Sequence, residues 1–73
     1  MMLPISQIEV GDQFQNPLFR DGNINVVMEV DTRERMVKIQ SYGFKDGSPI
    51  MKPFWVKNTH QMFQESWRTW RNS

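Results

Sequence analysis

Cysteine is absent from the 73 residues, histidine occurs once, and no hydrophobic run approaches the ~20 residues that span a bilayer. Without cysteine, the chain can form neither a disulfide nor a thiolate metal site, and it has no thiol nucleophile. A single histidine excludes a multi-histidine metal site. The first residues lack the cationic segment and the hydrophobic stretch of a secretory signal peptide. We therefore expect a cytoplasmic protein without membrane contact and without a metal or other cofactor.

Groups that carry out catalysis are also scarce. The one imidazole, His60, falls in the first turn of an expected helix, where an exposed or capping position is commoner than the role of a general base. No serine or threonine occupies a nucleophile elbow, and no glycine-rich loop precedes a helix to hold phosphate. The eight Asp and Glu residues fall mostly at expected turns and outward strand positions, which suits turn formation and solubility. We expect no enzymatic activity.

Hydrophobic alternation and turn signals predict one domain, residues 1–73, that is mainly β. Four short antiparallel strands are expected near residues 13–16, 24–30, 35–42 and 50–56. Gly11 and Asp12 are expected to turn the chain before the first strand, with glycine supplying a positive φ. Short strands hide their edges best when the sheet curls, so we expect a curled four-stranded sheet or small barrel with a C-terminal helix.

The strand pattern also predicts which side chains face the core. Pro17 marks the first strand as an edge, because proline cannot donate to a neighbouring strand. Phe54 is expected to point inward and Trp55 outward, since neighbouring strand residues face opposite sides. One face of the second strand is expected to carry Ile24, Val26, Met28 and Val30.

From Asn58 onward the hydrophobic residues no longer alternate as in a strand but recur at helical spacing. Asn58 is a good helix N-cap, and Gln61 three residues later completes a capping-box pattern. Phe63, Trp67 and Trp70 then follow at helical spacing. The pattern predicts a helix over about 59–70 that docks on the sheet.

Three short motifs follow one another along the chain: Ile8-x-Val10-Gly11-Asp12-x-Phe14, Val26-x-Met28-x-Val30-Asp31 and Val37-x-Ile39. Together they resemble small SH3-like barrels of phages and bacteria, over about residues 8–56, which implies that fold. The tryptophan-bearing tail, residues 57–73, departs from the generic barrel. In size and single-domain character the chain is also similar to the small RNA-polymerase-binding regulators that lytic phages encode. That similarity implies a partner in the host polymerase and an effect on transcription.

Net positive charge and aromatic residues concentrate near the C-terminus. Residues 1–48 carry five cations and seven anions, 5 − 7 = −2, whereas residues 49–73 carry four cations and one anion, 4 − 1 = +3. Trp and Arg are enriched at interface hot spots, and bases stack on aromatic rings beside cations. In SH3-like barrels, aromatic residues near the open end line the binding surface, although they can equally cover the rim of the core. The expected partner-binding residues are Tyr42, Phe44, Lys52, Trp55, Lys57, Arg68, Trp70 and Arg71.

These observations leave three functions open. We expect first a non-enzymatic binding protein, a monomer when free, that docks on a larger host protein such as RNA polymerase and alters transcription sterically. The alternative is direct binding of RNA or DNA through the basic aromatic C-terminal segment. The third is a homo-oligomer formed through the edge strand at 13–16.

Overall fold

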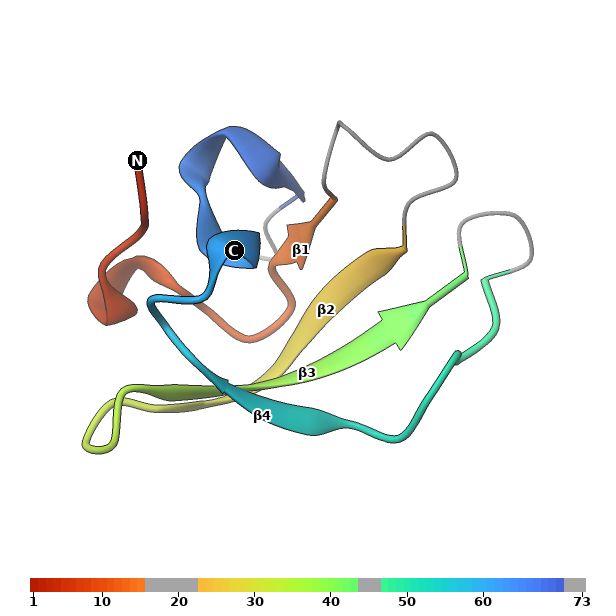
Figure 1. Cartoon of the computed structure of the whole chain (residues 1–73), viewed down its shortest axis with the longest axis horizontal. Coiled ribbons are helices and arrows are strands. Elements are labelled where there is room, and N and C mark those ends of the chain that lie inside the picture. The colour runs from red at the N-terminus through yellow and green to blue at the C-terminus, as the bar shows by residue number, and fades with distance from the viewer. Residues whose placement is uncertain (16–22, 44–46, 71–73) are drawn as a thin grey trace.

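The computed structural model describes residues 1–15, 23–43 and 47–70, apart from the side chain of Trp70. Within these ranges the protein is mainly β, as predicted, with five antiparallel strands in one sheet (Figure 1). The strands are β1 (Gln13–Phe14), β2 (Ile24–Asp31), β3 (Met36–Tyr42), β4 (Phe54–Lys57) and β5 (Arg68–Trp70), in the order β4-β3-β2-β1-β5. The helical elements are 3-10 turns: η1 (Ile5–Gln7), η2 (Gln61–Phe63) and η3 (Glu65–Trp67).

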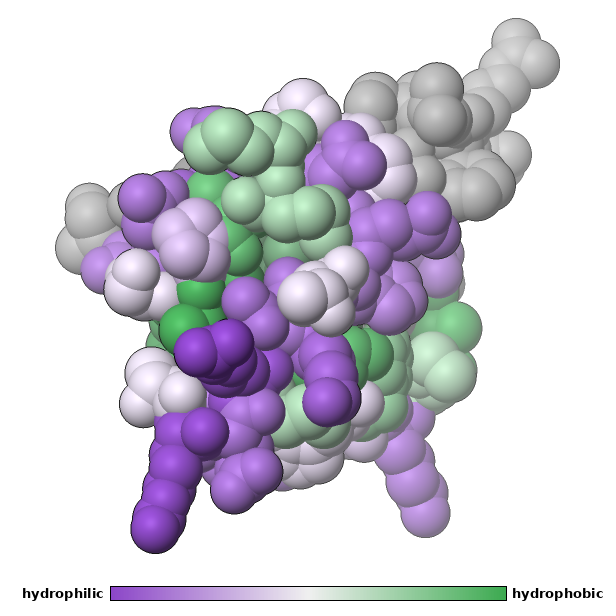
Figure 2. Space-filling model, turned by 60° about the vertical axis from the view of Figure 1, so that its left-hand side comes forward, coloured by the Kyte–Doolittle hydropathy of each residue, from purple (hydrophilic) through white to green (hydrophobic). Residues whose placement is uncertain are grey.

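The hairpin of β2 and β3 is the longest paired region. The Asp31 carboxylate accepts the backbone N–H groups of Arg33 and Glu34, both at 3.1 Å, and so forms the turn that precedes β3. Arg35 completes the turn with a positive φ of 56°. Figure 2 brings this end of the molecule forward and shows a largely hydrophilic surface, with hydrophilic side chains projecting from its lower part.

A β-bulge in β2 changes which side chains reach the core. The pairing with β3 shifts between Val27 and Glu29, so the strand contains one extra residue. Val27 is buried and Val30 packs against the core, whereas Met28 is exposed. The prediction that Ile24, Val26, Met28 and Val30 share one face is therefore wrong, because a bulge reverses the alternation at the point where it occurs.

The core lies between the twisted β2–β3–β4 layer and the first and last parts of the chain (Figure 1). The rings of Phe14 and Phe63 meet edge to face, with 5.3 Å between their centroids and 88° between their planes. Leu3 N–H donates to the Phe63 carbonyl at 3.0 Å, which holds the N-terminal segment against η2. The fully enclosed hydrophobic residues are Leu3, Ile8, Phe14, Val27, Val37, Ile39 and Phe63.

The predicted helix over 59–70 is wrong: this stretch forms η2, η3 and β5. A helix would have left β1 with a partner on one side only, whereas β5 pairs with its second side, and Gln15 N–H donates to the Trp67 carbonyl at 2.7 Å. The stretch also contains several residues of weak helix propensity. The capping residue of η2 is His60, whose Nδ1 accepts the Met62 N–H, rather than the predicted Asn58.

β1 is not an edge strand, because it lies between β2 and β5. The fourth strand begins at Phe54, later than the predicted residue 50. Pro49 makes an isolated bridge with Tyr42, and Pro53 has no N–H with which to continue the pairing between that bridge and β4. The edge of the sheet on this side is therefore the short β4.

Candidate binding sites

The outer face of β3 and β4 carries an exposed tryptophan. Trp55 is opposite Lys38, and Lys57 is opposite Met36; these four residues are called the β4 surface below. Trp55 is 43% exposed, and the Lys38 ammonium lies 6.0 Å from its ring centroid and 4.0 Å from the Glu29 carboxylate. Phe54, next to Trp55, packs against the core, which confirms the predicted orientation of the pair. The β4 surface thus presents an indole ring with cations around it.

The backbone of β4 is open along one side. Asn58 N–H donates to the Arg35 carbonyl at 3.0 Å, so these two residues form a hydrogen-bonded pair. Such pairs recur at every second residue of an antiparallel ladder, which places the bonds to β3 at Val56 and Phe54. The N–H and C=O of Trp55 therefore point away from β3, toward the open edge of the sheet.

The segment before β4 extends the exposed hydrophobic area. Ile50 and Met51 are 50% and 55% exposed, and Lys52 is exposed beside them. Gln40 is held beneath this segment, because its Nε2 donates to the Met51 carbonyl at 2.6 Å. Two predicted residues, Trp55 and Lys57, therefore lie together on β4, and Lys52 lies in the segment that leads into the strand.

Arg68, predicted as a surface cation, is tied to the turn before β1. Its Nη2 donates to the Gln7 carbonyl at 2.6 Å and lies 3.4 Å from the fully buried Asp12 carboxylate. The guanidinium also lies 5.7 Å from the Phe14 ring. Asp12 in turn accepts the Glu9 N–H at 3.0 Å. Arg68 therefore has a structural role in this arrangement, which removes one cation from the predicted basic tail.

The other predicted residues are not gathered with the β4 surface. Tyr42, at the end of β3, is half-buried beside an open groove of about 370 Å³, which Ile24 and Val26 also line. Trp70 lies on β5 opposite Gln13. Phe44 and Arg71 lie outside the described residues.

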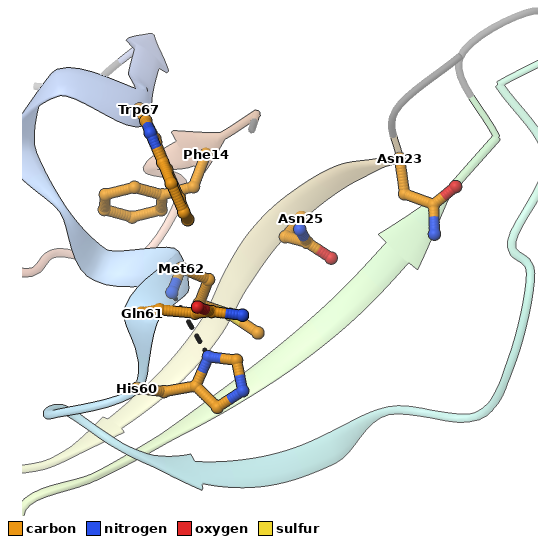
Figure 3. Close-up of a pocket in the computed structure, with 7 residues that line it drawn as sticks. All are labelled: Phe14, Asn23, Asn25, His60, Gln61, Met62 and Trp67. Atoms are coloured by element: carbon orange, nitrogen blue, oxygen red, sulfur yellow. Dashed lines mark hydrogen bonds between the residues drawn. The ribbon is translucent and has the colours of Figure 1, made fainter. Parts of the chain in front are cut away.

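A second site lies on the opposite side of the sheet from the β4 surface. It is a pocket of about 180 Å³ between β2 and the η2–η3 segment, called the amide pocket below. Figure 3 shows Trp67 and Phe14 on one side of it and the two asparagines on the other, with Gln61 and Met62 between them and His60 at one end. Its lining consists of Phe14, Asn23, Asn25, His60, Gln61, Met62 and Trp67.

Two of the polar side chains that line the amide pocket, Asn25 and His60, already make hydrogen bonds. Asn25 Oδ1 accepts the Ser41 hydroxyl at 2.6 Å, which leaves the Asn25 amino group as a donor. His60 Nδ1 accepts the Met62 N–H at 3.2 Å, so the neutral imidazole carries its proton on Nε2 and offers a second donor. Gln61 and Asn23 have no hydrogen-bond partner for their carboxamides within the described ranges.

Sequence reasoning did not find the amide pocket. A possible signal is the pair Asn23 and Asn25, because asparagine is disfavoured in strands and alternate residues share one face. The other lining residues come from segments far along the chain, and no local pattern connects them to this pair.

Residues 1–15, 23–43 and 47–70 contain no cluster of acidic, histidine or cysteine side chains that could hold a metal ion. None of their helical elements has the length and hydrophobicity that crossing a membrane requires. No protein-family model matches the chain, and neither a curated protein nor a solved structure is detectably similar to it.

Proposed function

We propose that the protein is a small non-enzymatic binding protein that docks on a larger protein through the β4 surface. The observation that carries this proposal is the 43% exposed Trp55 on an edge strand, beside Lys38 and Lys57. Tryptophan is enriched among the residues that dominate binding energy at interfaces, and the segment that leads into β4 exposes Ile50 and Met51 as well.

We also propose that the curled sheet is the SH3-like barrel that the motifs resemble. Two features support it. β5 returns to pair with β1, so that the first and last strands lie side by side, and the bulge in β2 increases the local bend of the sheet. The 3-10 turns η2 and η3 lie just before β5, and η2 places Phe63 in the core and Met62 against it.

The mode of docking follows from the open edge. An extended segment of the partner adds to β4 as a sixth strand, and its backbone bonds to the N–H and C=O of Trp55. Lys52 and Lys57 on either side favour an acidic segment, with a hydrophobic side chain placed against the indole. Self-pairing through the same edge is disfavoured, because two copies would bring their lysines together. The free protein is therefore a monomer.

For the identity of the partner, we propose the host RNA polymerase, with a steric effect on transcription in the host cytoplasm. The support is the similarity in size to small phage-encoded polymerase regulators. A standard interface buries ~800 Å² per partner. The chain exposes 5089 Å², so it has room for such an interface on one face.

The test is the affinity for purified bacterial RNA polymerase, measured by surface plasmon resonance for the natural chain and for Trp55→Ala. We expect the substitution to weaken binding at least about tenfold. Val10→Ala is the matched control, because Val10 is 55% exposed and lies outside the β4 surface. Equal affinities for all three proteins would show that the β4 surface is not the docking site.

A second experiment separates the site from the identity of the partner. A benzophenone amino acid in place of the exposed Lys57 keeps Trp55 intact and crosslinks whatever protein docks on the β4 surface in the host cell. A crosslinked protein other than polymerase would correct the partner and keep the site. Failure to crosslink any larger protein would contradict docking at β4.

A further inference from the structure

We infer that the amide pocket binds an unpaired nucleobase with carbonyl acceptors, namely uracil or thymine. This inference is independent of docking through the β4 surface. It rests on the seven residues between β2 and the η2–η3 segment and on the hydrogen bonds that orient them. The pocket, at about 180 Å³, is smaller than the ~300–1,000 Å³ typical of drug-sized ligands, and suits a single ring system.

The donors of the pocket select the edge of the base. The Asn25 amino group and the His60 Nε2–H are both held as donors, because the acceptor atom on each side chain is already occupied. The two carbonyl oxygens of uracil or thymine can satisfy two such donors, whereas the pairing edge of adenine offers a single acceptor beside its amino donor. The Gln61 carboxamide can both donate and accept, so it also matches the ring N–H between the two carbonyls of uracil or thymine.

The other wall provides a surface for stacking. Trp67 is half-buried, and Figure 3 shows its ring on the side of the pocket that faces the asparagines, with Phe14 beside it. Bases in single strands stack on aromatic side chains, and removal of the aromatic ring weakens binding of the strand. Met62 contributes a flexible hydrophobic side chain to the same space.

The described residues of the lining favour a base over a phosphate. None of the seven described residues that line the pocket is a lysine, an arginine or a carboxylate. Phosphate recognition depends on cations and weakens steeply with salt. We therefore expect binding that depends strongly on base identity and only weakly on salt concentration.

The experiment is fluorescence anisotropy with two fluorescein-labelled single strands, dT8 and dA8, which have the same length and charge. We expect dT8 to bind about tenfold more tightly than dA8, because one well-placed set of base contacts gives discrimination of that order. Free thymidine as a competitor distinguishes the two sources of the base. If thymidine displaces dT8, the pocket accepts the nucleoside alone. If thymidine does not displace dT8, the base must belong to a strand.

Asn25→Asp is the sharpest variant. It keeps the acceptor for the Ser41 hydroxyl and replaces the amino donor with a carboxylate oxygen. The added charge weakens dT8 and dA8 alike, so the readout is their ratio, which should fall to about one. Gln61→Ala, at an exposed residue, is the second variant and should lower the same ratio if Asn25→Asp does not fold. Val10→Ala, at an exposed residue outside both sites, is the control and should leave the ratio unchanged.

Equal binding of dT8 and dA8, or binding of neither, would overturn the inference. So would a ratio that Asn25→Asp and Gln61→Ala both leave intact. If an extended peptide shifts the NMR signals of the Asn25 amide and the His60 ring while dT8 does not, the pocket is a peptide site and the inference is wrong. Loss of polymerase binding by Trp55→Ala with the dT8 ratio intact would separate this site from the proposed docking function.

Discussion

The β2–β3 hairpin and the region of β1 and β5, where the two ends of the chain meet and which is called the closing region below, are both β structure, but they are held in different ways. The hairpin is linked by a short turn that Asp31 holds through two backbone N–H groups, and its strands pair outward from this turn, beginning with Asp31 and Met36. The closing region is held by contacts between the two ends of the chain, including Arg68 with Gln7 and Leu3 with Phe63. Local contacts form at a small entropic cost, whereas distant ones need the rest of the fold in place.

The two regions also contain two contrasting ion pairs. Asp12 and Arg68 pair in the closing region, where the side chains are 0% and 17% exposed. Glu29 and Lys38 pair across the hairpin at 4.0 Å, and the Glu29 side chain is 62% exposed. Exposed pairs contribute little to stability, while removal of one partner from a buried pair leaves an uncompensated charge. Substitutions in these pairs therefore measure how differently the regions are held.

The largest effect is expected for Asp12→Asn. It leaves the mostly buried Arg68 guanidinium without its anion and should lower the free energy of unfolding by about 3 kcal/mol. Urea unfolding monitored by circular dichroism measures the change. Glu29→Gln is the matched control and should change stability by less than about 0.5 kcal/mol. Similar losses for both substitutions would mean that the closing region does not depend on its buried pair.

Asp31→Ala should have a smaller effect, at the turn of the hairpin. The Asp31 side chain accepts two backbone N–H groups, so its loss should cost about 1 kcal/mol. If the hairpin forms before β5 pairs with β1, the loss should mostly slow refolding, whereas Asp12→Asn should mostly accelerate unfolding. Stopped-flow chevron plots of both variants provide the rates. If Asp31→Ala changes only the unfolding limb of the chevron plot, the turn of the hairpin forms late in folding, after the transition state.

The contrast between the regions explains what the sequence could predict. The hairpin, the turn at Gly11 with its φ of 94°, and the opposite orientations of Phe54 and Trp55 all follow from local patterns, and the structure contains them. The prediction of a helix over 59–70 was wrong because a distant contact, and not the local pattern, determines the structure of this stretch. The spacing of Phe63 and Trp67 fits a helix, yet pairing of β5 with the distant β1 decided the outcome.

The binding sites divide in the same way. Trp55 was predictable as an outward residue because alternation along one strand is enough to orient it. Arg68 was expected on the surface. The structure places it instead beside the buried Asp12, which lies near the other end of the chain and which no local pattern connects to Arg68. The amide pocket joins Asn25 of β2 to His60 and Trp67 of the η2–η3 segment, and only the folded chain brings these residues together.

The smallest effect, and the only gain, is expected for Arg35→Gly. Arg35 adopts a φ of 56°, a left-handed conformation that costs a residue with a Cβ atom about 1 kcal/mol and costs glycine almost nothing. Glycine also increases the entropy of the unfolded chain, which offsets part of this gain. We therefore expect the free energy of unfolding to rise by about 0.5 kcal/mol, measured by urea unfolding, with Arg33→Gly as the control that should not stabilise. A loss of stability in Arg35→Gly would mean that the Arg35 side chain, rather than its backbone conformation, supports the turn, and the hairpin would then be less local than its contacts indicate.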